Sequence, residues 1–116
     1  MTALLVKEPW ATMIVNGDKT IEIRTRRTKK INQEIFIAKS GSKTLIGKVT
    51  IVKCAPLTPE LFDSLSEQHK AGSIYPGKKI YGWFLSNPIK FDEPIPYTHP
   101  QGAQMWVNIP VCERKS

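Results

Sequence analysis

Residues 8–24, EPWATMIVNGDKTIEIR, contain the signals for a helix, for its end and for the strand that follows. Pro9 suits the first turn of a helix, where its missing N–H is not needed, and Gly17 suits the left-handed position just after a helix. Between them, apolar residues recur at the spacing that places them on one helix face. This pattern predicts a helix over residues 9–16 with one buried side.

After Gly17 the pattern changes to the alternation of a β-strand, which we predict over residues 19–25. Ile21 and Ile23 point to one side of this strand. The other side carries a hydroxyl, a carboxylate and a guanidinium, from Thr20, Glu22 and Arg24, with Lys19 at the start of the strand. These polar groups predict a cleft beside the strand.

A chain of 116 residues is one domain by length and can bury a core without disulfides or metal. Its 41% hydrophobic and 23% charged residues are ordinary for a soluble protein, and no apolar run reaches the length of a membrane span. The N-terminus lacks the basic opening of a signal peptide, so we expect a cytoplasmic protein. Cys54 and Cys112 have no partners at metal-ligand spacing, and we expect two buried thiols, no metal site and no cofactor.

Basic residues concentrate in one part of the chain. The net charge is +7, but residues 19–53 hold ten basic residues against Glu22 and Glu34, so this region alone carries +8. Such density is typical of proteins that bind a polyanion, most often a nucleic acid, although net charge of this size also serves solubility. We therefore expect RNA or a single-stranded nucleic acid as partner, and no membrane.

Further elements follow from composition and turn residues. Residues 58–60, TPE, combine a cap, a first-turn proline and an acidic residue, which predicts a helix ending near Lys70. Gly47 lies inside a strand and indicates a bulge or a close backbone approach, and the spaced prolines of residues 86–97 predict an edge or rim. Strands are predicted over residues 3–7, 34–39, 45–54, 80–85 and 104–109. The sequence thus indicates an α+β fold, with about six strands in a small, strongly bent sheet or barrel and two short helices.

The segment Arg26-Arg27-Thr28-Lys29-Lys30 is too charged to belong to a core. It is either a solvated loop or an arm that contacts phosphates. Lys39 and Ser40 follow a strand that should border the cleft, and they are secondary candidates for ligand binding.

Aromatic side chains offer surfaces on which a base could stack. Trp10 and Tyr81 are the candidates for this role, whereas Trp83 and Trp106 fit the core better. His69 is expected to be exposed near the end of the second helix, where the helix dipole favours a cation.

Several spaced motifs resemble the ASCH domain family, and the resemblance covers most of the chain. They are Pro9-Trp10-Ala11, Gly17, Lys19-Thr20, Glu22, Arg24, Ile46-Gly47-Lys48-Val49, Tyr81-Gly82-Trp83-Phe84-Leu85, Pro94-Ile95-Pro96 and Gln101-Gly102 through Trp106. The resemblance implies a single ASCH domain over residues 1–116, a PUA-like β-barrel and a cleft lined by the polar side of the strand at 19–25. Family members include nucleic-acid binders, ribonucleases and a bacterial branch of amidohydrolases acting on N4-acetylcytidine, and the fold alone does not choose among them.

The amidohydrolase branch uses a lysine, a threonine nucleophile three residues later and a glutamate after the second helix. Lys19 matches the lysine, but Glu22 occupies the position of the threonine, which removes the hydroxyl that the mechanism needs. Four residues beyond His69, Ser73 stands in place of the glutamate. We therefore do not expect this mechanism here.

Two hypotheses of different classes remain. The first is an RNA-binding module whose polar cleft holds a nucleotide or base, with a free nucleoside as a weaker alternative. The second is a metal-independent RNA-processing enzyme, a ribonuclease or a hydrolase of a modified nucleoside, with Lys19 and Glu22 as the catalytic candidates. The candidates for ligand binding are Trp10, Lys19, Thr20, Glu22, Arg24, Arg26, Arg27, Lys29, Lys30, Lys39, Ser40 and Tyr81.

Overall fold

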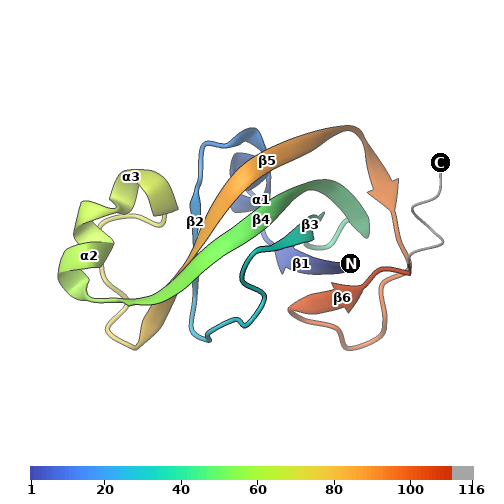
Figure 1. Cartoon of the computed structure of the whole chain (residues 1–116). Coiled ribbons are helices and arrows are strands. Elements are labelled where there is room, and N and C mark those ends of the chain that lie inside the picture. The colour runs from blue at the N-terminus through green and yellow to red at the C-terminus, as the bar shows by residue number, and fades with distance from the viewer. Residues whose placement is uncertain (111–116) are drawn as a thin grey trace.

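The computed structural model describes residues 1–110, and Cys112 lies outside them. The strands are β1 (Thr2–Val6), β2 (Ile21–Arg24), β3 (Gln33–Lys39), β4 (Thr44–Leu57), β5 (Ile80–Pro96) and β6 (Trp106–Asn108). The helices are α1 (Trp10–Asn16), α2 (Pro59–Ser64) and α3 (Ser66–His69). Together they form a mixed α+β fold in which the long strands β4 and β5 cross the whole molecule (Figure 1).

The six strands form one sheet in the order β2-β5-β4-β3-β1-β6. β1 and β3 run parallel, and every other pair of neighbours is antiparallel. Within residues 1–110 this hydrogen-bonded order ends at β2 on one side and at β6 on the other, so the sheet is not closed into the predicted barrel.

The open sheet is nevertheless strongly curled. The indole rings of Trp83 on β5 and Trp106 on β6 stack with centroids 5.8 Å apart, although three strands separate β5 from β6 in the sheet. Arg24 on β2 likewise reaches β1, where its Nη2 donates a hydrogen bond to the carbonyl oxygen of Leu5 at 2.9 Å. Side chains therefore bridge the gap that backbone hydrogen bonds would close in a barrel.

One face of helix α1 is buried against the curled sheet, and this buried face is what the sequence predicts. Its apolar residues Ala11, Ile14 and Val15 are buried in the main core, and it contacts β3, β4 and β5. Gly17 has a φ of 87°, the left-handed conformation that favours glycine, and its N–H donates a hydrogen bond to the carbonyl oxygen of Ile14. Gly17 therefore ends the helix. The fully buried Trp83 belongs to the same core, whereas Cys54 is only half-buried at its margin rather than fully buried.

The second predicted helix is two short helices, so the described residues contain three helices rather than two. Thr58 caps α2 as expected, since its Oγ1 accepts a hydrogen bond from the N–H of Leu61. Leu65 has a φ of −103° and a ψ of 16°, which interrupts the helix and turns α3 inward. His69 is consequently fully buried and stacked on Phe62 at 4.2 Å, so the expectation that it is exposed is wrong.

The proline-rich half of β5 lies at an edge, as predicted. β2 pairs with β5 only between Tyr81 and Phe84, so from Ser86 onward β4 is its only partner among the described strands. A proline at the unpaired edge of β5 removes no hydrogen bond between strands, which allows β5 to continue to Pro96. No helix within residues 1–110 has the length and apolar character needed to cross a membrane.

Gly47 on β4 lies where two other segments approach the strand, which confirms the expectation of a close contact. A Cβ atom at this position would clash with the carbonyl oxygen of Ile89 and with the side chain of Val15.

We expect Gly47→Ala to lower the free energy of unfolding by about 2 kcal/mol, measured by urea denaturation, because the backbone of β5 and helix α1 must both shift. Val52→Ala, at a 41% exposed position of the same strand, is the control and should change it by less than about 0.5 kcal/mol. Equal stability of the two variants would show that Gly47 is not closely packed against Ile89 and Val15.

Candidate functional site

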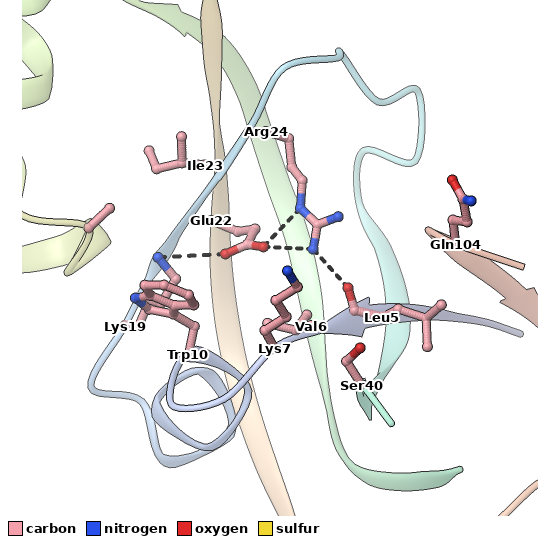
Figure 2. Close-up of a pocket in the computed structure, with 11 residues that line it drawn as sticks. Leu5, Val6, Lys7, Trp10, Lys19, Glu22, Ile23, Arg24, Ser40 and Gln104 are labelled. Atoms are coloured by element: carbon pink, nitrogen blue, oxygen red, sulfur yellow. Dashed lines mark hydrogen bonds and ion pairs between the residues drawn. The ribbon is translucent and has the colours of Figure 1, made fainter. Parts of the chain in front are cut away.

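A pocket of about 330 Å³ lies between the ends of β1 and β3, the start of α1 and strand β2 (Figure 2). Its volume falls at the lower end of the range for small-molecule sites, about 300–1,000 Å³. It is lined by Leu5, Val6, Lys7, Trp10, Lys19, Glu22, Ile23, Arg24, Ser40, Ala71 and Gln104. The pocket therefore contains five of the residues predicted to bind a ligand, Trp10, Lys19, Glu22, Arg24 and Ser40.

The parallel pairing of β1 and β3 brings two polar residues to one side of the pocket. Val6 is the register partner of Lys39, so the chain leaves both strands at the same edge of the sheet. Ser40 then donates its N–H to the carbonyl oxygen of Val6 at 2.9 Å. Lys7 and Ser40, the residues that follow the two strands, are both exposed and both line the pocket.

A largely buried cluster of three charges also lines the pocket. The Oε2 atom of Glu22 lies 2.8 Å from Nε and 2.7 Å from Nη2 of Arg24, and its Oε1 atom lies 3.6 Å from Nζ of Lys19. Lys19 is 2% exposed and Glu22 is 7% exposed. Because a buried charge is costly unless it is paired, Lys19 and Arg24 each depend on Glu22, and Glu22 depends on both cations.

Lys19 is fixed from a second side by the helices. Its Nζ donates a hydrogen bond to the carbonyl oxygen of His69. The backbone N–H of the neighbouring Thr20 donates a hydrogen bond to the carbonyl oxygen of Gln68 at 2.9 Å. Burial lowers the pKa of the Lys19 amine, the charge of Glu22 partly offsets this, and the charge of Arg24 adds to the lowering. The amine is therefore held in place, and its pKa lies below that of an exposed lysine.

The two oxygens of Glu22 are used unequally. Oε2 accepts a hydrogen bond from Nε of Arg24 at 2.8 Å and lies 2.7 Å from its Nη2, whereas the only ion-pair partner of Oε1 among residues 1–110 is Nζ of Lys19 at 3.6 Å. Figure 2 shows the carboxylate lying between these two cations. Oε1 therefore keeps the capacity to accept a hydrogen bond from a ligand.

Trp10 stands at the rim of the pocket. Its indole is 36% exposed, and its Nε1 donates a hydrogen bond to the carbonyl oxygen of Lys70 at 3.3 Å. This bond ties the ring to the end of α3 and holds it at one orientation. An exposed, oriented aromatic face beside charged groups is suited to stacking on a planar ligand.

The remaining predicted residues lie outside the pocket lining. The backbone of Thr20 connects α3 to β5, and the ammonium of Lys39 lies 3.7 Å from the carboxylate of Glu8. Tyr81 is buried in the main core, where the guanidinium of Arg27 covers its ring at 4.8 Å. Arg26, Lys29 and Lys30 belong with Arg27 to the loop between β2 and β3.

His69 cannot serve the pocket as an acid or base. Its Nδ1 accepts a hydrogen bond from the N–H of Ala71 at 2.9 Å, so the ring proton lies on Nε2, which donates to the carbonyl oxygen of Phe62 at 2.7 Å. Both ring nitrogens are occupied in this way, and only the backbone oxygen of His69 reaches Lys19.

Lys7 and Gln104 line the pocket but were not among the predicted residues. Lys7 directly follows a buried strand. Ligand sites often lie at the carboxyl ends of parallel strands, so this position would have been a candidate if the parallel pairing of β1 and β3 had been known. Gln104 lies in the loop before β6, and nothing in the sequence indicates that this loop returns to the pocket. Within residues 1–110, no cluster of three or more histidine, cysteine, aspartate or glutamate residues is suited to hold a metal ion.

Glu8 supports the start of α1, and with it the position of Trp10. Its carboxylate accepts hydrogen bonds from both N–H and Oγ1 of Thr12. Burial raises the pKa of this carboxyl, but the hydrogen bonds from Thr12 and the charge of Lys39 outweigh the effect and hold the pKa below its usual value.

We expect Glu8→Gln to lower the free energy of unfolding at pH 7 by about 0.5–1 kcal/mol, since a helix cap is weakened at a partly exposed position. Because the pKa of Glu8 is lower in the folded state, its stabilisation is complete above the unfolded value of about 4.3 and is lost as the pH falls through the folded pKa. Urea denaturation of both proteins at pH 7 and pH 3 should show the difference shrinking at pH 3. A difference that stays constant with pH would contradict this role.

Comparison with known proteins identifies the family. The model of the ASCH domain matches residues 4–95. The crystal structure of ASCH from Zymomonas mobilis is similar to this chain at 17% identity and a TM-score of 0.75, covering 97% of this chain and 90% of that one. Two mutant proteins of ZmASCH, also from Zymomonas mobilis, give TM-scores of 0.78 at 18% and 17% identity, covering 97% of this chain and 90% and 92% of theirs. No significant match was found among curated protein sequences. Because the family model spans most of the chain, the protein belongs to the ASCH domain family.

Proposed function

We propose that this protein binds single-stranded RNA and that its pocket holds one unpaired nucleotide. Membership of the ASCH domain family, which is thought to bind RNA, supports the choice of polymer. The observation that carries the proposal is the pocket itself, in which an exposed indole, a carboxylate oxygen with spare capacity and an exposed ammonium face one cavity of about 330 Å³. A cytoplasmic location, where unpaired RNA is available, is part of the proposal.

Each group has a role in this arrangement. Trp10 stacks on the base, as aromatic side chains do with unpaired bases in many RNA-binding proteins. Glu22 Oε1 accepts a hydrogen bond from an exocyclic amino group, which favours cytosine or adenine over uracil. Lys7, which is exposed and lines the pocket, neutralises a phosphate. Lys19 and Arg24 hold the carboxylate of Glu22 in place.

The proposal is tested with fluorescence anisotropy of labelled RNA octanucleotides over a range of salt concentrations. We expect saturable binding, with cytosine- and adenine-containing strands bound more tightly than oligouridine. Lys7→Gln should weaken binding and reduce the slope of log K against log salt by about 0.7, the value for one lost phosphate contact on a single strand. Lys90→Gln, an exposed lysine far along β5, is the control and should retain the slope. Absence of saturable binding, or equal effects of the two variants, would contradict the proposal.

A second candidate function is an RNA-processing enzyme, either a ribonuclease or a hydrolase of a modified nucleoside. The observation that favours it is Lys19, a buried amine with a lowered pKa that lines a pocket beside a carboxylate. Incubation with RNA, single-stranded DNA and modified nucleosides including N4-acetylcytidine, followed by mass spectrometry, distinguishes the two functions. A product that disappears in a folded Lys19→Met variant supports the enzyme, whereas binding without any product supports the RNA-binding module.

A further inference from the structure

The loop between β2 and β3 carries a dense positive charge that no carboxylate of residues 1–110 neutralises by an ion pair. Four of its residues are basic: Arg26, Arg27, Lys29 and Lys30. The ion pairs found within residues 1–110 involve Glu8, Glu22 and Glu34, and none of them reaches this loop. Arg26, Arg27 and Lys29 are exposed. Their charges are therefore available to an external anion.

Contacts to aromatic residues hold this basic loop in place. The Nε1 atom of the buried Trp83 donates a hydrogen bond to the carbonyl oxygen of Arg26 at 3.0 Å. The guanidinium of Arg27 lies 4.8 Å above the ring of Tyr81, and the ammonium of Lys30 lies 5.1 Å above the ring of Trp106. Cation–π contacts orient a cation without cancelling its charge, in contrast to an ion pair. The loop thus presents oriented charges at a reduced entropic cost of binding.

The basic loop begins and ends beside the pocket. Its first residue, Thr25, follows Arg24, which lines the pocket through the charge cluster. At its other end Lys30 covers Trp106, which is two residues from the pocket residue Gln104. Figure 2 shows the chain leaving Arg24 on the side of the pocket where Gln104 lies. An anionic chain that emerges from the pocket on this side would meet the loop.

We propose that the basic loop is a second contact for the same RNA strand and binds the phosphates of the nucleotides next to the one in the pocket. This inference rests on the proposed function, since it assumes that RNA occupies the pocket. A single strand is the ligand that fits, because a continuous backbone of phosphates can follow a row of cations while one of its bases is turned into a cavity. The pocket then selects the nucleotide, and the loop supplies affinity that depends on salt and on strand length.

The test compares a 5′-mononucleotide with an RNA octanucleotide, each titrated at several salt concentrations. The loop variant carries Arg26→Gln, Arg27→Gln and Lys29→Gln, and it leaves Lys30 over Trp106. A matched control with the same loss of charge carries Lys78→Gln, Lys79→Gln and Lys90→Gln, all exposed and outside both sites. Thermal melting and near-ultraviolet circular dichroism establish that both variants are folded.

For the octanucleotide, we expect the loop variant to lower the slope of log K against log salt by about 2, as three lost phosphate contacts require, and the control to lower it by less than about 0.5. The mononucleotide should bind the loop variant and the original protein equally. If the octanucleotide binds but its slope is the same in the loop variant and in the control, the loop is not a contact and this inference fails while the proposed function stands. If neither ligand binds the original protein, the proposed function fails as well.

Discussion

Replacing Glu22 by glutamine is expected to lower the free energy of unfolding by about 3 kcal/mol, measured by urea denaturation at pH 7. The carboxylate is 7% exposed and lies between two cations, Lys19 and Arg24, of which Lys19 is itself 2% exposed. Removing the negative charge leaves both cations without their anion in a desolvated site, and breaking a buried pair typically costs about 3–5 kcal/mol. Against the total stability of about 5–15 kcal/mol of a single domain, this is a large loss.

Glu34→Gln is the matched control for this prediction. Glu34 also pairs with a lysine, since its Oε1 lies 3.4 Å from Nζ of Lys48, but the carboxylate is 40% exposed. Solvent-exposed ion pairs contribute about 0–1 kcal/mol, so this variant should remain close to the original protein. Similar losses in the two variants would show that the charge cluster of the pocket is not the buried, interdependent unit described above.

Replacing Trp10 by alanine is expected to weaken RNA binding by about 10- to 100-fold, because stacking of one base on an aromatic side chain is worth about 1–3 kcal/mol. Trp10 is 36% exposed and lies outside the main core, so the loss of stability should be small by comparison. Fluorescence anisotropy with the RNA octanucleotide measures the effect on affinity, and thermal melting measures the effect on stability.

Trp10→Phe separates stacking from packing in this experiment. Phenylalanine keeps an aromatic face but loses the hydrogen bond from Nε1 to the carbonyl oxygen of Lys70. It should retain most of the affinity that alanine removes. If Trp10→Ala binds RNA as tightly as the original protein, Trp10 is not the stacking surface and the base lies elsewhere.

The local part of the fold could be predicted from the sequence. Pro9 and Gly17 delimit α1, the alternation after Gly17 marks β2, and Gly47 indicates a close contact, because each signal depends on a few neighbouring residues. The central ion pair of the pocket could also be predicted from neighbouring residues. Glu22 and Arg24 are two residues apart on one strand, so their side chains share a face whatever the rest of the chain does.

Features set by distant contacts could not be predicted in this way. The break at Leu65 turns α3 inward and buries His69, and it depends on packing against Phe62 rather than on helix propensity. The sheet curls without closing because side chains such as Trp106 fill the gap between its edges. Lys7 joins the pocket only through the parallel pairing of β1 with β3, which no local pattern reveals.

Binding of an unpaired nucleotide in the pocket can be followed by nuclear magnetic resonance of the ¹⁵N-labelled protein during titration with cytidine and adenosine 5′-monophosphates. The chain has three tryptophans, so its spectrum contains three indole N–H signals, of which the one from Trp83 serves as internal control. Trp83 is buried, and neither it nor Trp106, which stacks on it, lines the pocket. We predict a saturable shift of the Trp10 indole signal and of the Lys7 and Ser40 amides, with the Trp83 signal unchanged. Shifts confined to residues outside the pocket, or no shift at millimolar nucleotide, would contradict the account.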